Sequence, residues 1–198
     1  MPRTTVVKGE VSMQDLTEVL KEKKILMGIS GANAVWQSVE TIGKLRDYGA
    51  AVYIVMTANA AKFVSPITFQ RASNHKVELD MWDQPMAMDA AHKPLAKIID
   101  FVLVAPATAN IISKMSNGTA DDMLTTTLLS IDKPIFIAPC MNPIMYKNPI
   151  IQENITRLRK YPEHFCFIEP QEQSKKGKIL SPDQIVGAIA KHFITAEI

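Results

Sequence analysis

Short runs of apolar residues alternate with longer helical patterns along most of this chain. A short apolar run between turn signals is typical of a strand that is buried on both faces of a sheet. Such runs occupy residues 24–29, 51–57, 101–105, 134–138 and 164–168. Helical patterns lie at residues 34–47, 59–73 (with a new start at Ser65-Pro66), 109–130, 149–160 and 182–194. This alternation predicts an α/β fold with a doubly wound parallel sheet between two layers of helices.

The beginning of the chain predicts a short helix of its own. Ser12 stands at a capping position, and Asp15 completes the pattern of a capping box three residues later. Apolar residues then recur at helical spacing up to residue 22. We therefore expect residues 1–23 to form a loose arm and a short amphipathic helix, and residues 24–198 to form one domain.

The composition excludes several classes of protein. The chain has 198 residues and a formal net charge of +2, so no strong field would attract nucleic acid or an anionic membrane. No apolar run approaches the roughly 20 residues of a membrane helix, and the first residues lack the apolar core of a signal peptide. Two cysteines are too few for a disulfide framework, and no residue spacing matches a metal site. We expect a cytoplasmic protein that binds no nucleic acid, membrane or metal.

Small and hydrogen-bonding residues follow four of the predicted strands. They form the segments Ser30–Asn33, Thr57–Asn59, Pro106–Asn110 and Pro139–Asn142. In Rossmann-like sheets, ligands bind outside the carboxyl ends of the strands. Small residues let backbone N–H groups approach a phosphate, and the N-terminus of the next helix favours its charge. Taken alone, Ser30 and Asn33 are explained equally well as helix caps, but four such loops on one edge favour a mononucleotide site.

A few residues near this edge have side chains suited to chemistry. His92 precedes the third strand, and histidine is the residue type suited to acid–base chemistry near neutral pH, although a histidine in such a position is more often a surface or core residue. Cys140 lies in a strand-end loop and could be reactive, whereas Cys166 lies in a predicted strand, where cysteine usually packs as a small apolar residue. Met145 follows Asn142 closely on the same edge.

Two segments of the chain resemble the motifs of a known family. Pro106-Ala-Thr-Ala-Asn110, with the helical segment that begins at Asn117-Gly-Thr, resembles a Pro-Ala-Ser-Ala-Asn-Thr motif and its downstream helix. Pro139-Cys-Met-Asn-Pro-Ile-Met-Tyr146 resembles a Pro-x-Met-Asn-x-x-Met-Trp motif. Both motifs belong to the homo-oligomeric flavin-containing cysteine decarboxylases, a group with a Rossmann-like flavoprotein fold. The resemblance extends from about residue 24 to residue 170.

The resemblance implies an FMN cofactor at the edge of the sheet. The residues that it places against FMN are Gly31, Ala32, Asn33, Thr57, Ala58, Asn59, Thr108, Ala109, Asn110, Ile111 and Cys140. It makes His92 the active-site histidine and Asn142 the residue that holds the substrate carboxylate, with Met145 beside it in the substrate pocket. It also implies a homotrimer or a dodecamer with the flavin site at a subunit interface.

The resemblance implies a reaction as well. FMN oxidises the carbon that bears sulfur in a cysteine carboxylate, and the resulting thioaldehyde loses CO2 to give an enethiol. In phosphopantothenoylcysteine decarboxylase of coenzyme A biosynthesis, the same flavin then reduces the enethiol, with a cysteine of a late Ala-Cys-Gly-Asp motif as proton donor. The corresponding segment of this chain, residues 170–180, contains no cysteine.

This absence favours the branch of the family that stops at the enethiol. We therefore expect oxidative decarboxylation of a C-terminal peptidyl cysteine to an aminoenethiol, as in lantibiotic maturation. One alternative is decarboxylation of phosphopantothenoylcysteine, with Cys140 in place of the missing donor. A second alternative is an inactive FMN-binding regulatory subunit, against which the presence of both His92 and Asn142 argues.

Overall fold

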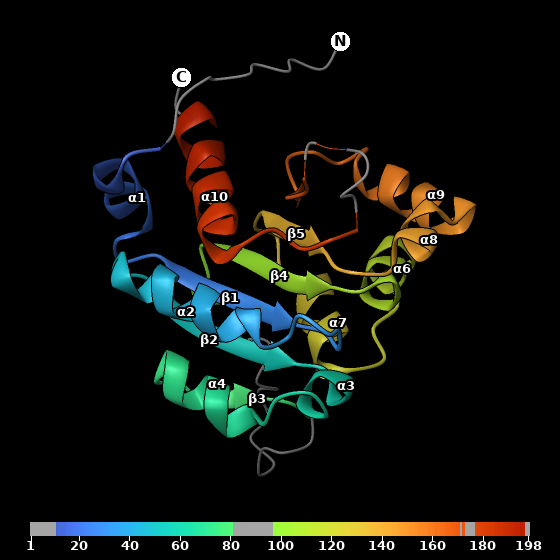
Figure 1. Cartoon of the computed structure of the whole chain (residues 1–198), viewed down its shortest axis with the longest axis horizontal. Helices are drawn as coiled ribbons and strands as arrows, with labels where there is room; N and C mark the ends of the chain where they lie inside the picture. The colour runs from blue at the N-terminus through green and yellow to red at the C-terminus, as the bar shows by residue number, and fades with distance from the viewer. Residues whose placement is uncertain (1–10, 81–96, 171, 173–176, 197–198) are drawn as a thin grey trace.

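The computed structural model describes residues 11–80, 97–170, 172 and 177–196, which form a parallel sheet between helices (Figure 1). Six strands of this part of the chain are hydrogen-bonded in the order β3-β2-β1-β4-β5-β6. Their bounds are β1 Lys24–Ile29, β2 Ala51–Met56, β3 Val77–Glu78, β4 Phe101–Ala107, β5 Ile135–Pro139 and β6 Phe165–Phe167. This is the order of a doubly wound Rossmann-like sheet, in which the direction of winding reverses between β1 and β4. The predicted fold class is confirmed.

The register of the central strands brings their carboxyl ends to one edge. Strand β1 pairs with β2 from Lys24 opposite Ala51 to Ile29 opposite Met56. On its other side β1 pairs with β4, with Gly28 opposite Val104. All the strand pairs of the described sheet are parallel. The loops that follow β1, β2, β4 and β5 therefore leave the sheet at the same edge.

Helices cover both faces of the sheet, and each face has its own hydrophobic core. Along β1, Ile25 and Met27 belong to one core and Leu26 belongs to the other, as the two-residue period of a strand requires. The first core is covered by α1 Met13–Leu20, α2 Gln37–Asp47, α4 Pro66–Ser73 and α10 Pro182–Ala196. The second is covered by α6 Ala109–Asn117, α7 Met123–Leu129, α8 Pro143–Lys147 and α9 Pro149–Leu158. The short α3 Ala58–Ala61 follows β2.

Three features differ from the sequence prediction. The helix predicted at residues 109–130 is two helices, because Gly118 ends α6 with a φ of +65° and Asp122 begins α7 with a capping box. Helix α8 and strand β3 were not predicted, since they have only 5 and 2 residues and such short elements give no periodic pattern. The other predicted strands and helices are present, with ends shifted by a few residues.

The predicted capping box at the start of α1 is confirmed. Asp15 N–H donates to the Ser12 hydroxyl, and the Asp15 carboxylate accepts from the Ser12 backbone. The helix packs against α10, and Leu20 is buried in the core between α1 and the sheet. Residues 1–10 lie outside the described residues. Among the described helices, none has the length and apolar character needed to cross a bilayer.

The core next to α10 generates a stability prediction. The Phe101 ring lies 5.4 Å from Phe136 and 5.3 Å from Phe193, centroid to centroid, and is fully buried. We expect Phe101→Ala to lower the free energy of unfolding by about 3–5 kcal/mol because it leaves a cavity, as measured by urea denaturation. The exposed control Ile150→Ala should change it by less than about 0.5 kcal/mol. Equal effects of the two substitutions would contradict this account of the core.

Candidate functional site

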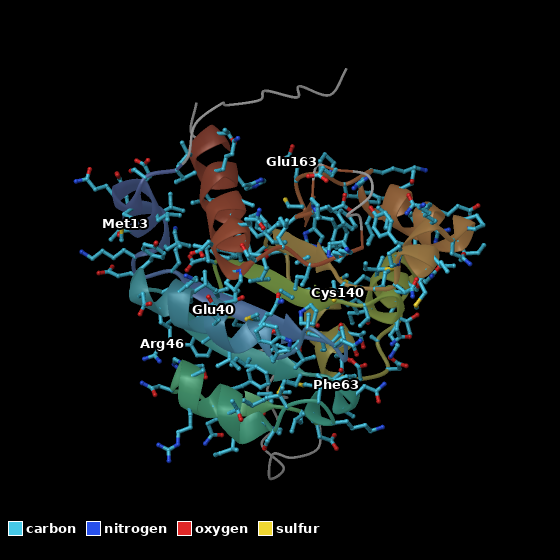
Figure 2. The ribbon with its side chains drawn as sticks, in the orientation of Figure 1. Met13, Glu40, Arg46, Phe63, Cys140 and Glu163 are labelled. Atoms are coloured by element: carbon cyan, nitrogen blue, oxygen red, sulfur yellow. The ribbon has the colours of Figure 1, made fainter. Side chains whose placement is uncertain are left out.

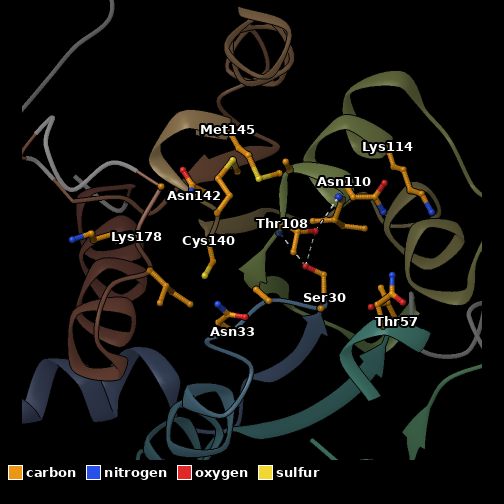
Figure 3. A pocket seen from close by; sticks show the side chains of 18 of the residues that line it. Ser30, Asn33, Thr57, Thr108, Asn110, Lys114, Cys140, Asn142, Met145 and Lys178 are labelled. Atoms are coloured by element: carbon orange, nitrogen blue, oxygen red, sulfur yellow. Dashed lines mark hydrogen bonds between the residues drawn. The ribbon is translucent and has the colours of Figure 1, made fainter. Parts of the chain in front are cut away.

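A cleft of about 830 Å³ lies at the carboxyl ends of the strands, where the strand order reverses (Figure 3). Loops after β1, β2, β4 and β5 contribute to it, as does a segment near residue 178 that is far away in the sequence. Its volume is in the range of about 300–1,000 Å³ that is usual for ligand sites. The lining residues are Ser30, Gly31, Ala32, Asn33, Gln37, Thr57, Ala58, Asn59, Thr108, Ala109, Asn110, Ile111, Lys114, Asp122, Cys140, Met141, Asn142, Met145, Gly177, Lys178 and Ile179.

Ser30 fixes the loop after β1 against the loop after β4. Its side chain is buried, and its hydroxyl donates to the Pro106 carbonyl at 2.8 Å. The same hydroxyl oxygen accepts from Thr108 N–H at 3.0 Å. The explanation of Ser30 as a helix cap is wrong, because α2 begins after Trp36 without a side-chain cap. Ser30 instead holds the two halves of the sheet together at the floor of the cleft.

The loops after β1 and β2 are in direct contact at a glycine. A Cβ atom added to Gly31 would lie 2.8 Å from the backbone carbon of Asn59 and 3.0 Å from its carbonyl oxygen. Real Cβ atoms do not approach backbone so closely, so only glycine permits this contact. Thr57 and Thr108 each cap the helix that follows, through Ala60 N–H and Ile111 N–H. The cleft edge is therefore built of tightly fixed backbone.

Two residues after β5 supply side chains of different chemistry, Cys140 (Figures 2 and 3) and Asn142 (Figure 3). Burial raises the pKa of the Cys140 thiol, although the backbone N–H groups of Ala34 and Ile179 favour its thiolate. The thiol therefore keeps its proton at neutral pH. Asn142 accepts a hydrogen bond from Ile144 N–H on its side-chain oxygen at 2.8 Å. The NH2 group of this exposed amide remains as a donor toward a ligand.

Of the two lysines that line the cleft, Lys114 is neutralised by carboxylates and Lys178 is available to an anionic ligand. Lys114 pairs with Asp121 at 2.6 Å and with Asp122 at 3.2 Å, and its hydrogen bond lowers the pKa of Asp121. Lys178 has no described carboxylate within ion-pair distance. The buried side-chain oxygen of Gln37 has no hydrogen-bond partner among the described residues. An acceptor in this position favours a ligand that carries a hydroxyl or N–H donor.

The structure brings the predicted site residues together at this cleft, with one exception. Every residue predicted to contact FMN lines it, from Gly31 to Cys140, and so do Asn142 and Met145. His92 lies outside the described residues. The sequence analysis included Ser30 and Met141 in the strand-end segments without assigning either a contact. It did not select six further lining residues, Gln37, Lys114, Asp122, Gly177, Lys178 and Ile179. For the last three residues, Gly177, Lys178 and Ile179, the only sign in the sequence is the short basic turn that contains Gly177 and Lys178.

Comparison with solved structures finds proteins with the same fold. The FMN-dependent cysteine decarboxylase SpaF superposes with a TM-score of 0.78 at 30% identity, over 90% of this chain and 99% of SpaF. MrsD from Bacillus sp. HIL-Y85/54728 superposes with a TM-score of 0.75 at 27% identity, over 88% of this chain and 98% of MrsD. A PPC decarboxylase mutant complexed with pantothenoylaminoethenethiol has a TM-score of 0.75 at 23% identity, over 88% of this chain and 100% of that protein, and shares the fold.

Comparison with known sequences identifies the family. The coenzyme A biosynthesis bifunctional protein CoaBC of Bacillus subtilis is 42% identical over 181 residues, which are 88% of this chain. The corresponding protein of Escherichia coli is 32% identical over 180 residues. The chain spans 44% of the length of each of these two relatives. The family model described as Flavoprotein matches residues 13–194. This chain therefore belongs to the flavoprotein family.

Proposed function

We propose that this chain is an FMN-dependent decarboxylase of phosphopantothenoylcysteine. The observation that carries this proposal is the cleft at the switch point of the sheet, where the predicted FMN-contact residues and Asn142 converge. The choice of substrate follows the relatives, since CoaBC of Bacillus subtilis is 42% identical and SpaF is 30% identical. The sequence analysis preferred a peptidyl cysteine, and these identities favour its alternative.

The residues of the cleft fit FMN. The loop that begins at Gly31 leads into α2, and Gln37, the first residue of α2, lines the cleft with Gly31. This end of the cleft suits the phosphate, because backbone N–H groups and the N-terminal end of the helix dipole favour an anion there. The unpartnered oxygen of Gln37 would accept from a hydroxyl of the ribityl chain. When bound, FMN supplies the oxidation of the carbon that bears the substrate sulfur, which makes loss of CO2 possible.

The chain's own residues bind the substrate and manage its protons. The amide of Asn142 donates to the substrate carboxylate without the full charge that would over-stabilise the group to be lost. Cys140 is a protonated thiol within the cleft and is the proposed proton donor for reduction of the enethiol. His92 is proposed to handle the proton of the substrate thiol. Met145 contributes an apolar surface to the same end of the cleft.

Oxidation of a peptidyl cysteine is the second candidate. The specific observation in its favour is that residues 170–180 contain no cysteine to act as the usual donor. The structural similarity to SpaF and MrsD agrees with it. The two candidates share the oxidative step and differ in the fate of the enethiol.

Product mass separates the candidates. Holoprotein is incubated in air with phosphopantothenoylcysteine and, separately, with a peptide that ends in cysteine. Loss of CO2 alone from phosphopantothenoylcysteine is the expected result. Loss of CO2 and two hydrogens from the peptide would establish the second candidate instead. An FMN-bound protein that converts neither substrate would indicate a regulatory subunit, and the proposal would be wrong.

We also propose a homo-oligomer, either a homotrimer or a dodecamer. Trp36 and Ile144 are exposed apolar side chains, each next to a cleft-lining residue in the chain. If the two side chains belong to one contiguous apolar patch, that patch would suit a subunit interface beside the site. Light scattering of the purified protein gives the mass that tests this expectation, and a monomer would contradict it.

Cys140→Ser tests the proposed proton donor. With phosphopantothenoylcysteine, the variant should release the enethiol, two hydrogens lighter than the wild-type product, because a hydroxyl is a far weaker acid than a thiol. FMN content serves as the control and should be unchanged. A wild-type product from Cys140→Ser would show that the proton comes from another group.

Gly31→Ala tests the FMN cradle. The new methyl group would meet the Asn59 backbone at 2.8 Å and force the two loops apart. We expect FMN affinity to fall at least about tenfold, the equivalent of one lost charge-assisted hydrogen bond, as measured by quenching of flavin fluorescence. In the matched control Gly43→Ala, the added atom meets nothing within 4 Å, so affinity should be unchanged. If both variants bind FMN equally well, this account of the cradle is wrong.

Asn142→Asp tests the carboxylate anchor. Aspartate can still cap Ile144 N–H, so only the charge near the substrate changes. The like charge should raise KM about tenfold or more. The matched control is Asn148→Asp, because Asn148 caps Ile150 N–H in an equivalent Asn-Pro-Ile turn but does not line the cleft. Normal KM in Asn142→Asp would remove Asn142 from the binding site.

A further inference from the structure

A buried tyrosine, Tyr146, packs behind the cleft wall that carries Asn142 and Met145. Both residues belong to the turn of α8, in which Tyr146 N–H donates to the Asn142 carbonyl. Met145 lines the cleft, whereas the next side chain, Tyr146, points into the core and is 4% exposed. Any movement of this ring therefore moves the cleft-lining residues of the same short helix.

The Tyr146 hydroxyl donates a hydrogen bond to a buried carboxylate, that of Glu169. It donates to one oxygen of Glu169 at 2.6 Å, and Arg159 pairs with the other oxygen at 2.8 Å. The Glu169 side chain is 4% exposed, and the Arg159 guanidinium lies 5.0 Å from the centre of the Phe167 ring. A buried carboxylate is stable only with such partners. Burial and Glu169 raise the pKa of Tyr146 to about 12, so the hydroxyl keeps its proton to donate.

A second segment of the chain, residues 177–179, packs against Tyr146 through Gly177. Gly177 is buried with a φ of +83°, and a Cβ added to it would lie 2.9 Å from the Tyr146 Cβ. Its carbonyl accepts from Met141 N–H at 2.7 Å. Lys178 and Ile179, which line the cleft, follow directly. Tyr146 therefore contacts both sides of the substrate end of the cleft.

We propose that Tyr146, Glu169 and Arg159, here called the Tyr146 clamp, act as positioning residues that fix the distance between Asn142 and the 177–179 segment. The clamp sets the width of the substrate end and leaves the FMN end, around Gly31 and Thr57, unaffected. Its role in substrate binding rests on the proposed function, but its geometric effect does not. None of its three residues lines the cleft itself.

Labelling of Cys140 tests the geometric effect without any substrate. Cys140 and Ile179 line the same cleft, and the Ile179 N–H is near enough to the Cys140 thiol to favour its thiolate. Release of the 177–179 segment therefore exposes the thiol. In Tyr146→Phe, which loses only the hydroxyl, maleimide labelling of Cys140 should be about tenfold faster, in proportion to one lost hydrogen bond to a charged group. Cys166, which faces His192 at 3.9 Å, is the internal reference and should change less than twofold. Equal acceleration at both cysteines, or none at Cys140, would overturn the proposal.

Steady-state kinetics test the consequence for the substrate. Tyr146→Phe should raise KM for phosphopantothenoylcysteine about tenfold while kcat and FMN affinity change less than about threefold. The matched control Tyr161→Phe alters a tyrosine that is 61% exposed and should leave all three unchanged. Arg159→Met should reproduce the effect and Arg159→Lys should partly restore KM, which provides the test if Tyr146→Phe does not fold. Unchanged KM in both clamp variants would overturn the proposal.

The two sets of measurements separate the clamp from the proposed function. A wild-type protein without turnover, in which Tyr146→Phe still exposes Cys140 selectively, would refute the proposed function and support the clamp. Turnover by the wild type, with no change in labelling or KM in Tyr146→Phe and Arg159→Met, would refute the clamp alone.

Discussion

The parallel pairing of β1 with both β2 and β4 is the constraint on which the rest of this structure depends. It places the ends of three strands at one edge and makes the chain turn in opposite directions on either side of β1. A cleft opens where the connections diverge. The buried hydroxyl of Ser30 closes its floor through hydrogen bonds to Pro106 and Thr108. Gly31 permits the loop from β2 to approach closely, so the cofactor end of the cleft is fixed by backbone rather than by long side chains.

The substrate end of the cleft is built differently. It depends on one turn of helix and on a segment from late in the chain, which meet at the buried ring of Tyr146. Its polar groups are a neutral amide, a protonated thiol and the cation of Lys178. In the proposed function, the amide and the lysine would bind the substrate carboxylate, and the thiol would supply a proton. Under the proposed function, FMN would occupy the end that is fixed by backbone, and the substrate would occupy the end that rests on Tyr146.

Much of the fold and of the cofactor end could be predicted from the sequence, because both depend on local patterns. Buried strands such as Phe101–Ala107 are continuous apolar runs, and the small residues after them mark the ligand edge. The substrate end could be predicted only in part. Helix α8 is too short for a periodic pattern, and the contact between Gly177 and Tyr146 joins residues that are far apart in the chain. The pairing of Glu169 with Tyr146 depends on the same long-range packing, for which one sequence carries no signal.

The central claim is that the backbone around Gly31 binds the phosphate of FMN at the switch point of the sheet. Equilibrium titration of cofactor-free protein with FMN and with riboflavin, which lacks the phosphate, tests it most directly. The account predicts that FMN quenches its fluorescence on binding with at least about tenfold higher affinity than riboflavin, since the phosphate adds charge-assisted hydrogen bonds. Equal affinities for the two flavins, or no binding of either, would contradict the account.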